Sequence, residues 1–380
     1  MSTIETIDLL STSPGTHRQL KVHRFGRVDA RPKAYIQAAL HADEYPGLLV
    51  AQHLIDQLLA LEHRKEIIGE IIVVPVANPI GLSQRVNDQH LGRYELSGGG
   101  NFNRNWPDMT DALAQRVDGQ LSDDADQNIE LIRKALEHEV SMLNVQTELD
   151  HLKQSLLQFS IGADVVLDLH SDCQALPHLY SSIHHQTVAE ELCCELGAEV
   201  LLLETEAGGN PFDECNAGVW WKLQQRFASH ALVPLACFSA TIELRGQMDV
   251  QDDLARHDAK GLISFLRRRG LLQGPCEALP LPQCEATPLE GTDLIYSPSA
   301  GVIVFQKKLG DWVEAGDIVA ELVDPMANSP EESRVPLKSR TSGLLFAHVS
   351  ERLVTPGTSI AKVAGKIALE HRKSGQLLEA

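Results

Sequence analysis

The chain has 380 residues, 43% of them apolar, and a formal net charge of −19, which is typical of a globular protein that can bury a site and contain two domains. Because nucleic-acid binders usually present a basic surface, this charge argues against nucleic acid and anionic lipid as partners. The sequence begins without a basic segment followed by an apolar core and has no run near the roughly 20 apolar residues of a membrane span, so we expect a cytoplasmic protein that binds no membrane.

Runs typical of strands alternate with runs typical of helices from Val22 to about Arg269. The strand-like runs include "AYIQAAL", "EIIVVPVANP", "ADVVLDLH", "AEVLLLE" and "ACFSATIEL", and the first is followed by the helical run "LLVAQHLIDQLLAL". This alternation predicts an α/β fold in which helices pack on a largely parallel or mixed sheet.

The first strand-to-helix corner carries ionisable residues. In "AYIQAALHADEYPGLLVAQHLIDQLL" (residues 34–59), His41, Asp43 and Glu44 interrupt an apolar run before a helical pattern resumes. Ligands of α/β sheets bind at such corners. His41 and Glu44 are three residues apart, so an imidazole nitrogen and a carboxylate oxygen can point to the same side and bind one cation.

A glycine-rich loop follows the next strand. The segment "GRYELSGGGNFNRNWPD" places Arg93, Asn103 and Arg104 around this loop. Arg104 has the planar fork that matches a substrate carboxylate, and Arg93 could polarise a scissile carbonyl or hold a second anion. The three glycines suggest a phosphate-binding loop, but the GK[ST] element of such loops is absent.

Between residues 109 and 160 the chain is acidic and has helical periodicity without strand signals. We expect a helical hairpin inserted between two parts of the site. Our interpretation is that this hairpin is a solvated cover that takes no part in the chemistry.

The segment "GADVVLDLHSD" supplies a third ligand, because its apolar strand ends on His170 at the same edge of the sheet as His41 and Glu44. Two histidines and one glutamate are the ligands of the catalytic zinc in carboxypeptidase A, where the fourth position is left for water. The sequence therefore predicts one zinc ion per chain. In the alternative interpretation no metal is bound. His41 and Glu44 then form a hydrogen-bonded pair at the start of a helix, and the imidazole of His170 has its hydrogen-bonding groups satisfied at the end of its strand.

A candidate general acid/base ends another apolar strand. In "CFSATIELRG", Glu243 follows mostly apolar or small residues, and burying a carboxylate there without a purpose would be costly. A zinc hydrolase needs such a group to take a proton from water and to pass it to the leaving amine. The alternative is an ion pair between Glu243 and Arg245.

Beyond Gly270 a segment rich in Pro and Gly, "GPCEALPLPQCEATPLEGTD", predicts a linker between two domains, which we assign to residues 1–285 and 286–372. In the second domain "SPSAGVIVFQKKLGDWVEAGDIVAEL" and "SRTSGLLFAHVSERLVTPGTSIAKV" repeat one pattern, which predicts a duplicated β-hairpin unit that closes into a small all-β sandwich. This unit resembles the barrel-sandwich domains of biotin and lipoyl carriers. The connection "VDPMANSPEESR" contains no lysine, so the resemblance implies their shape without carrier activity.

The motifs "HADE", "NP" at positions 78 and 79, "NFNR", "DLH" and "TIEL" occur in this order between about Leu40 and Gly246. In this combination the chain resembles the succinylglutamate desuccinylase/aspartoacylase family, relatives of the zinc carboxypeptidases. The resemblance implies a three-layer αβα domain with a mixed sheet, followed by a small β domain beside the site. It also implies the roles of particular residues: zinc ligands His41, Glu44 and His170; carboxylate-binding residues Asn103 and Arg104; and the general acid/base Glu243.

The identity of the second site arginine stays open, because the stretch between Asn78 and Asn103 is longer than in the desuccinylases and Arg85 competes with Arg93.

The function that we predict is a zinc-dependent amidohydrolase that cleaves the amide of an N-acyl amino acid or a similar small anionic substrate. One alternative is a metallocarboxypeptidase acting on peptides or cell-wall fragments. The other is a non-catalytic binding protein on the same scaffold. The sequence leaves open whether the chain forms a homo-oligomer.

Overall fold

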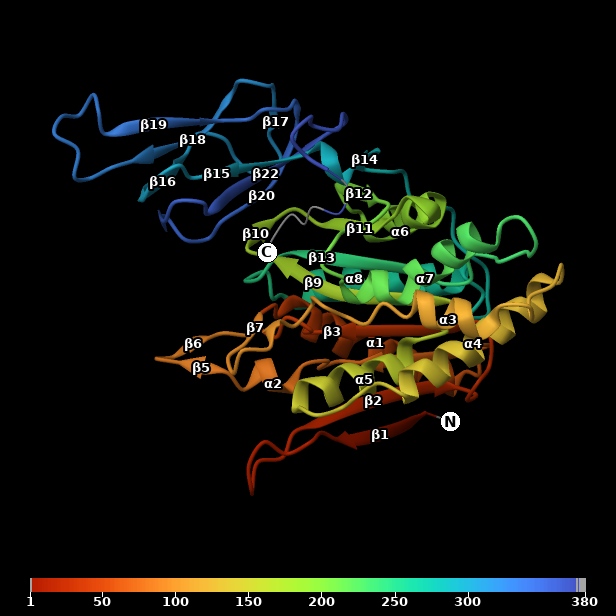
Figure 1. Cartoon of the computed structure of the whole chain (residues 1–380). Helices are drawn as coiled ribbons and strands as arrows, with labels where there is room; N and C mark the ends of the chain where they lie inside the picture. The colour runs from red at the N-terminus through yellow and green to blue at the C-terminus, as the bar shows by residue number, and fades with distance from the viewer. Residues whose placement is uncertain (1, 374, 376–380) are drawn as a thin grey trace.

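The structure is a computed structural model of the chain, and it describes residues 2–373 and 375. Its main sheet has nine strands. In spatial order these are β1 (Thr3–Asp8), β2 (Gln19–Gly26), β4 (Glu70–Val74), β3 (Lys33–Ala38), β9 (Val165–Asp172), β13 (Phe238–Gly246), β11 (His178–Ser182), β12 (Val200–Glu204) and β14 (Ala286–Pro288). Strands β4, β3, β9 and β13 run parallel (Figure 1). On one side, β2 is antiparallel to both of its neighbours, and on the other side β11 is antiparallel to β13 but parallel to β12. The predicted mixed sheet is therefore confirmed.

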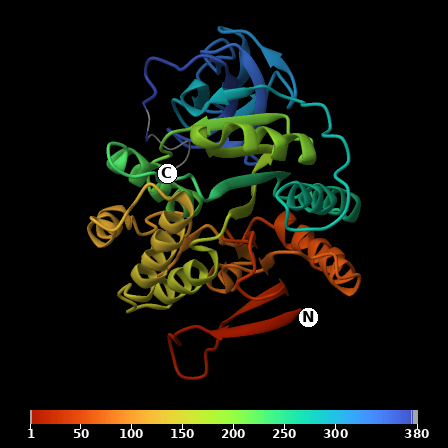
Figure 2. The same cartoon turned by 90° about the vertical axis from the view of Figure 1, so that its right-hand side faces the viewer.

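Helices cover both faces of this sheet (Figure 2). On one face, α1 (Pro46–His63) and α6 (Gln186–Leu196) contact α8 (Asp252–Arg268). On the other lie α3 (Thr110–Val117), α4 (Ala125–Ser141), α5 (Glu148–Ser160) and α7 (Phe212–Phe227). Side chains alternate along a strand, so β3 directs Ile36 to the first face and Tyr35 to the second. Each face therefore has its own buried apolar cluster.

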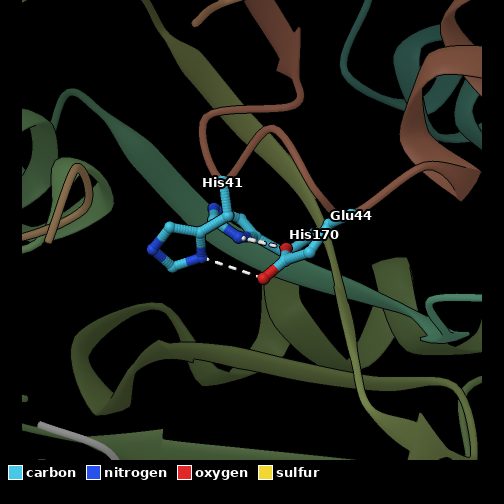
Figure 3. Close-up of side chains that lie close together, drawn as sticks. All are labelled: His41, Glu44 and His170. Atoms are coloured by element: carbon cyan, nitrogen blue, oxygen red, sulfur yellow. Dashed lines mark hydrogen bonds and ion pairs between the residues drawn. The ribbon is translucent and has the colours of Figure 1, made fainter. Parts of the chain in front are cut away.

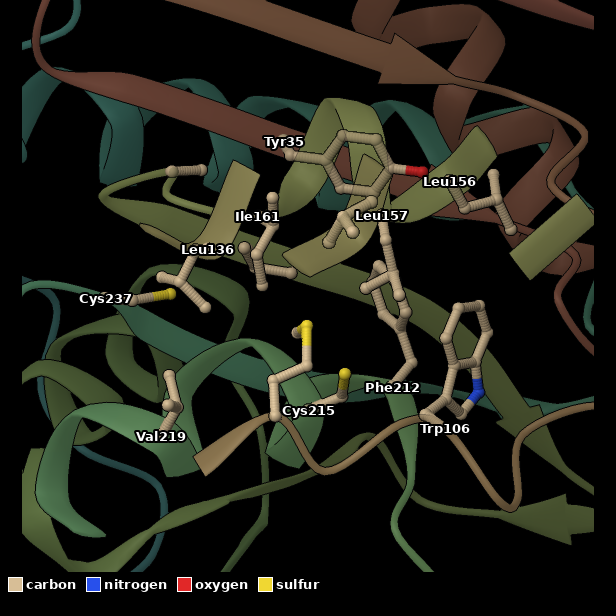
Figure 4. Close-up of a cluster of buried hydrophobic side chains, with 14 of the residues drawn as sticks. Tyr35, Trp106, Leu136, Leu156, Leu157, Ile161, Phe212, Cys215, Val219 and Cys237 are labelled. Carbon is tan, nitrogen blue, oxygen red and sulfur yellow. The ribbon is translucent and has the colours of Figure 1, made fainter. Parts of the chain in front are cut away.

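The segment from 109 to 160 differs from its prediction. It forms three helices, α3 to α5, instead of a hairpin of two. On their apolar faces, Leu113, Leu136 and Leu156 are fully buried in the same cluster as Tyr35. Figure 4 shows Leu136, Leu156 and Tyr35 in this cluster. The expectation of a solvated cover is therefore wrong. Helical periodicity predicts that a helix has one apolar face and one polar face, but it does not show how much of the rest of the protein packs against the apolar face.

Local sequence fixes where these helices begin. Thr147 forms a capping box at the start of α5, where its hydroxyl accepts a hydrogen bond from the backbone N–H of Asp150 at 3.0 Å and the Asp150 carboxylate accepts one from the N–H of Thr147 at 2.9 Å. The Asp124 carboxylate accepts from the N–H of Gln127 at 3.1 Å and caps α4. Pro46 occupies the first turn of α1, where its missing N–H costs nothing.

The C-terminal part of the chain forms two small antiparallel sheets. Their strands are β15 (Thr292–Tyr296), β16 (Gly301–Phe305), β17 (Trp312–Val313), β18 (Ile318–Val323), β19 (Arg334–Lys338), β20 (Gly343–His348), β21 (Leu353–Val354) and β22 (Ser359–Gly365). Strand β10 (Gln174–Ala175), which directly follows β9, pairs with β20. The segment that directly follows β9 is therefore hydrogen-bonded into the C-terminal sheets.

Short elements connect these parts. They are α2 (Pro79–Leu82), the hairpins β5 (Arg85–Val86) with β6 (Gln89–His90) and β7 (Tyr94–Glu95) with β8 (Gly100–Asn101), and the short helices η1 (Ile183–His185) and η2 (Leu289–Gly291). Of the helices in the described part of the chain, none combines the length and the apolar character that crossing a membrane requires.

Candidate active site

The predicted first corner follows β3 and precedes α1. The side-chain amide of Asn78 donates to the carbonyl oxygen of Leu40 at 2.8 Å, and the N–H of Glu44 donates to the carbonyl oxygen of His41 at 3.2 Å. These bonds close a tight turn between strand and helix. Strand β9, which neighbours β3 in parallel, carries His170 at its carboxyl end. The fold therefore brings the two halves of the predicted ligand set to one edge of the sheet.

The side chains of His41, Glu44 and His170 converge (Figure 3). His41 Nδ1 lies 2.9 Å from Glu44 Oε1, and His170 Nδ1 lies 2.8 Å from Glu44 Oε2. The candidate ligand atoms of the three residues lie within 4.8 Å of one another, and all three side chains are buried. Two imidazole nitrogens and a carboxylate suit zinc, so this group could hold such an ion.

Further residues fix the orientation of both imidazoles. His41 Nε2 lies 2.8 Å from Asn101 Oδ1, and His170 Nε2 lies 2.9 Å from Asp168 Oδ2. An oxygen thus lies close to the outer nitrogen of each ring, and each Nδ1 lies within hydrogen-bond distance of the Glu44 carboxylate. Metal-binding histidines show this pattern of outer partners. The alternative of a simple helix-start pair does not account for the convergence of His170 on the same carboxylate.

Two imidazoles, a backbone N–H and a guanidinium surround the Glu44 carboxylate. Burial opposes its ionisation, but the two imidazoles hold the pKa of Glu44 well below its ordinary value. The N–H of Ser171 donates to Oε2 at 3.0 Å, and Arg93 Nη2 donates to Oε1 at 2.9 Å. Burial lowers the pKa of His41, and Arg93 lowers it further, which favours the neutral imidazole that binds metals.

Glu243 lies on β13 beside the ligand group. Its backbone is in register with His170 on the neighbouring strand β9. Burial and then the nearby Glu44 raise the pKa of Glu243 to about 8. The alternative partner, Arg245, forms an ion pair with Asp258 on α8, with Nη1 3.3 Å from Oδ1. The structure therefore contradicts the alternative in which Glu243 serves only as the partner of Arg245.

A cleft with a volume of about 90 Å³ opens onto these residues. Both acidic and basic residues line this cleft. It is therefore less basic than a pocket expected to bind a purely anionic substrate. The residues that line it are His41, Arg93, Asn103, Arg104, His170, Asp172, Tyr180, Glu204, Ala207, Pro211, Asp213, Thr241, Glu243, Leu289 and Lys362. Lys362 belongs to β22, so the C-terminal part of the chain contributes to the cleft.

The predicted carboxylate-binding residues line the same cleft. Asn103 is buried, and its side-chain oxygen accepts from the N–H of Phe212 at 2.8 Å, which orients the amide. Arg104 Nη1 donates to the carbonyl oxygen of Asn103 at 2.7 Å. Of the two competing arginines, Arg93 lines the cleft, whereas Arg85 is exposed on the β5 hairpin. The geometry therefore favours Arg93.

Sequence reasoning missed several residues of this site. Asp168 precedes His170 by two positions on one strand, so strand alternation alone could have placed both on the same face. Asn101 lies in the quoted "NFNR" motif, but nothing local indicates its contact with His41. Lys362, Glu204 and Asp213 come from distant segments and carry no local signal.

Fold and site together define an α/β protein with a buried His-Glu-His group and a carboxylate at the carboxyl edge of a mixed sheet. Residues 30–269 match the model of the succinylglutamate desuccinylase/aspartoacylase catalytic domain. The chain therefore belongs to this family of acyl-amino-acid deacylases, which confirms the resemblance seen in the motifs.

Individual relatives agree with this assignment. The chain is 23% identical over 346 residues to N-alpha-acetyl-L-2,4-diaminobutyric acid deacetylase from Halomonas elongata, and the match covers 88% of this chain and 82% of the relative. A succinylglutamate desuccinylase/aspartoacylase family protein from Shewanella amazonensis has a similar structure, with a TM-score of 0.85, 28% identity, and coverage of 96% of this chain and 99% of that one. An ectoine utilization protein from Ruegeria pomeroyi shares the fold, with a TM-score of 0.66, 18% identity, and coverage of 96% of this chain and 95% of that one.

Proposed function

We propose that the chain is a zinc-dependent amidohydrolase that cleaves the amide bond of an N-acyl amino acid, releasing a carboxylate and a free amine. The observation that carries the proposal is the convergence of His41, Glu44 and His170 beside a buried carboxylate, Glu243, in one cleft. The names of the family and of the Halomonas relative, a deacetylase of an N-acylated diamino acid, support the same reaction class.

The zinc ligands would be His41, Glu44 and His170. When bound, zinc polarises a carbonyl oxygen and lowers the pKa of water. Glu243 would act as the general base and then as the general acid: its carboxylate takes the proton of the attacking water and passes it to the nitrogen of the leaving amine. Its buried position beside the ligand group supports this role.

Arg104 and Asn103 would orient the substrate. The guanidinium of Arg104 can pair with a substrate carboxylate through two parallel hydrogen bonds. Asn103 can add a donor through its side-chain Nδ2, because its side-chain oxygen accepts from the backbone N–H of Phe212. Arg93 supports the site from the other side through its contact with Glu44.

A hydrolysis screen tests the proposal. The zinc-loaded protein and its Glu243→Gln variant are incubated with N-acetyl, N-succinyl and N-formyl amino acids and with dipeptides, and the release of free amine is measured. We expect cleavage of N-acyl amino acids by the wild type and its loss in the variant. Cleavage of dipeptides alone would indicate a metallocarboxypeptidase, and no cleavage by fully zinc-loaded protein would indicate a binding protein.

A further inference from the structure

Two cysteines lie in contact where the main sheet leads into the C-terminal sheets. Cys193 belongs to α6, and Cys284 lies two residues before β14, the last strand of the main sheet. Cys193 is part of the buried apolar cluster between α6, α8 and the sheet, and Cys284 packs against the same cluster. A hydrogen bond joins the two thiols. The fold therefore brings together two sulfur atoms from distant parts of the chain.

This hydrogen bond makes the two thiols different in acidity. Cys193 donates its proton, so the bond and then burial raise the pKa of Cys193. Cys284 accepts this bond, which lowers its pKa although burial acts in the opposite direction, and the backbone N–H of Leu201 lowers it further. Cys284 therefore ionises more readily than its partner. The thiolate is the form of cysteine that attacks oxidants.

Cys284 is also the accessible member of the pair. It is partly exposed and lines a cavity of about 490 Å³, which shares no lining residue with the active-site cleft. Cys193 is only 4% exposed and does not line this cavity. A small oxidant that enters the cavity therefore meets Cys284 first, and Cys193 is held next to the sulfur that it would oxidise.

We propose that Cys284 and Cys193 form a redox-active pair, which hydrogen peroxide converts into a disulfide. The Cys284 thiolate attacks one peroxide oxygen, an S–O bond forms, the O–O bond breaks, and the departing hydroxide takes a proton from solvent to become water. The Cys193 sulfur then attacks the sulfenic acid on Cys284. The S–S bond forms as the S–O bond breaks, and the Cys193 proton leaves with the hydroxide as a second water. Two thiols are thus oxidised while one peroxide is reduced to two waters.

The arrangement combines the features of cysteines that respond to oxidants. Such cysteines form a thiolate readily, are accessible and lie next to a second thiol that resolves the sulfenic acid. Two thiols already in hydrogen-bond contact need only a small displacement to be bridged. Cys194 is less suited to be the partner, because burial raises its pKa and successive side chains of a helix point about 100° apart around its axis.

The test oxidises the folded, zinc-loaded full chain with equimolar hydrogen peroxide. The remaining thiols are then alkylated, the protein is digested without reductant, and the peptides are identified by mass spectrometry. We expect a cross-linked peptide that contains Cys193 and Cys284 and that disappears after treatment with dithiothreitol. Recovery of the two cysteines only in separate peptides would overturn the proposal.

Two serine variants assign the roles within the pair. Cys193→Ser removes the resolving thiol, so peroxide should leave a sulfenic acid on Cys284, which dimedone converts into a stable adduct. Cys284→Ser removes the attacking thiol, so Cys193 should form neither a cross-link nor an adduct. An adduct on Cys193 in this variant would contradict the assignment of Cys284 as the attacking thiol.

Cys194→Ser is the matched control, because Cys194 is a buried cysteine that directly follows Cys193 on α6. This variant should form the cross-link as the wild type does. Loss of the cross-link would assign the bond to Cys194 and overturn the pairing. The digest of the wild type needs no variant, so it is decisive even if a serine variant does not fold. The measurement also requires no hydrolysis, so its outcome does not depend on the proposed deacylase function.

Discussion

Lys362 of β22 and Asp172 of β9 form an ion pair across the base of the cleft, with Nζ 2.6 Å from Oδ2. Both side chains are buried. Asp172 follows His170 by two residues, so the pair connects the strand that carries a candidate zinc ligand to the C-terminal sheets.

This ion pair predicts a large effect on stability. Lys362→Met leaves the buried Asp172 carboxylate without its partner, and we expect the free energy of unfolding to fall by about 3 to 5 kcal/mol in urea denaturation. Lys366→Met is the control, since Lys366 pairs with Glu285 at the surface and its loss should not change the unfolding midpoint measurably. Equal midpoints for both variants would show that the buried pair is not required.

The three helices between 110 and 160 provide a second prediction. Leu136 on α4 is fully buried, so Leu136→Ala should lower the free energy of unfolding by about 2 to 5 kcal/mol. Glu137→Ala on the same helix changes an exposed side chain and should stay within about 0.5 kcal/mol of the wild type. A solvated cover would give two small effects, so similar midpoints would restore that interpretation.

The difference between these helices and their prediction shows which structural features a sequence pattern can predict. Apolar residues such as Leu136 recur at helical spacing, so the helices were predictable. Their position was not, because periodicity shows that one face is apolar but not which distant surface covers it. His41, Glu44, His170 and Glu243 were predictable for the opposite reason, since each directly follows or ends an apolar strand and parallel strands end at one edge.

Contacts between distant segments explain what the sequence could not predict. The pair of Lys362 with Asp172 joins residues 190 positions apart, and the lining of the cleft joins Glu204 at the end of β12 to Asp213 at the start of α7. No local pattern marks such residues, because a lysine or glutamate in a strand looks the same whether it faces solvent or a cleft. Only the assembled fold identifies them.

Asp168 provides a prediction on metal affinity. Because its Oδ2 lies 2.9 Å from the outer nitrogen of His170, Asp168→Asn should weaken zinc binding by about 10- to 100-fold without removing a ligand. Competition with a chelator of known affinity measures this change. Asp126→Asn on the exposed face of α4 should bind zinc like the wild type, and an unchanged affinity in Asp168→Asn would mean that His170 does not depend on this contact.

Glu243 provides a prediction on catalysis. Glu243→Gln keeps the size of the side chain but removes the group that accepts and donates a proton, so kcat should fall by at least about 10²-fold, the lower end of the contribution of a general acid/base. The zinc content of the variant, measured by elemental analysis, should equal that of the wild type. Hydrolysis at an undiminished rate would assign the proton transfer to another residue.

Arg104 provides the last prediction, which concerns the substrate carboxylate. A charge-assisted hydrogen bond contributes roughly 1.5 to 3 kcal/mol, so wild-type protein should favour an N-acyl amino acid over its C-terminal amide by about 10- to 150-fold in kcat/KM. Arg104→Ala should lose most of this preference and retain its zinc. Arg85→Ala is the matched control, because Arg85 is exposed outside the cleft and its loss should leave the preference intact. If the amide is cleaved as well as the acid by the wild type, Arg104 does not recognise a carboxylate, and the substrate must be held in the cleft by its other groups.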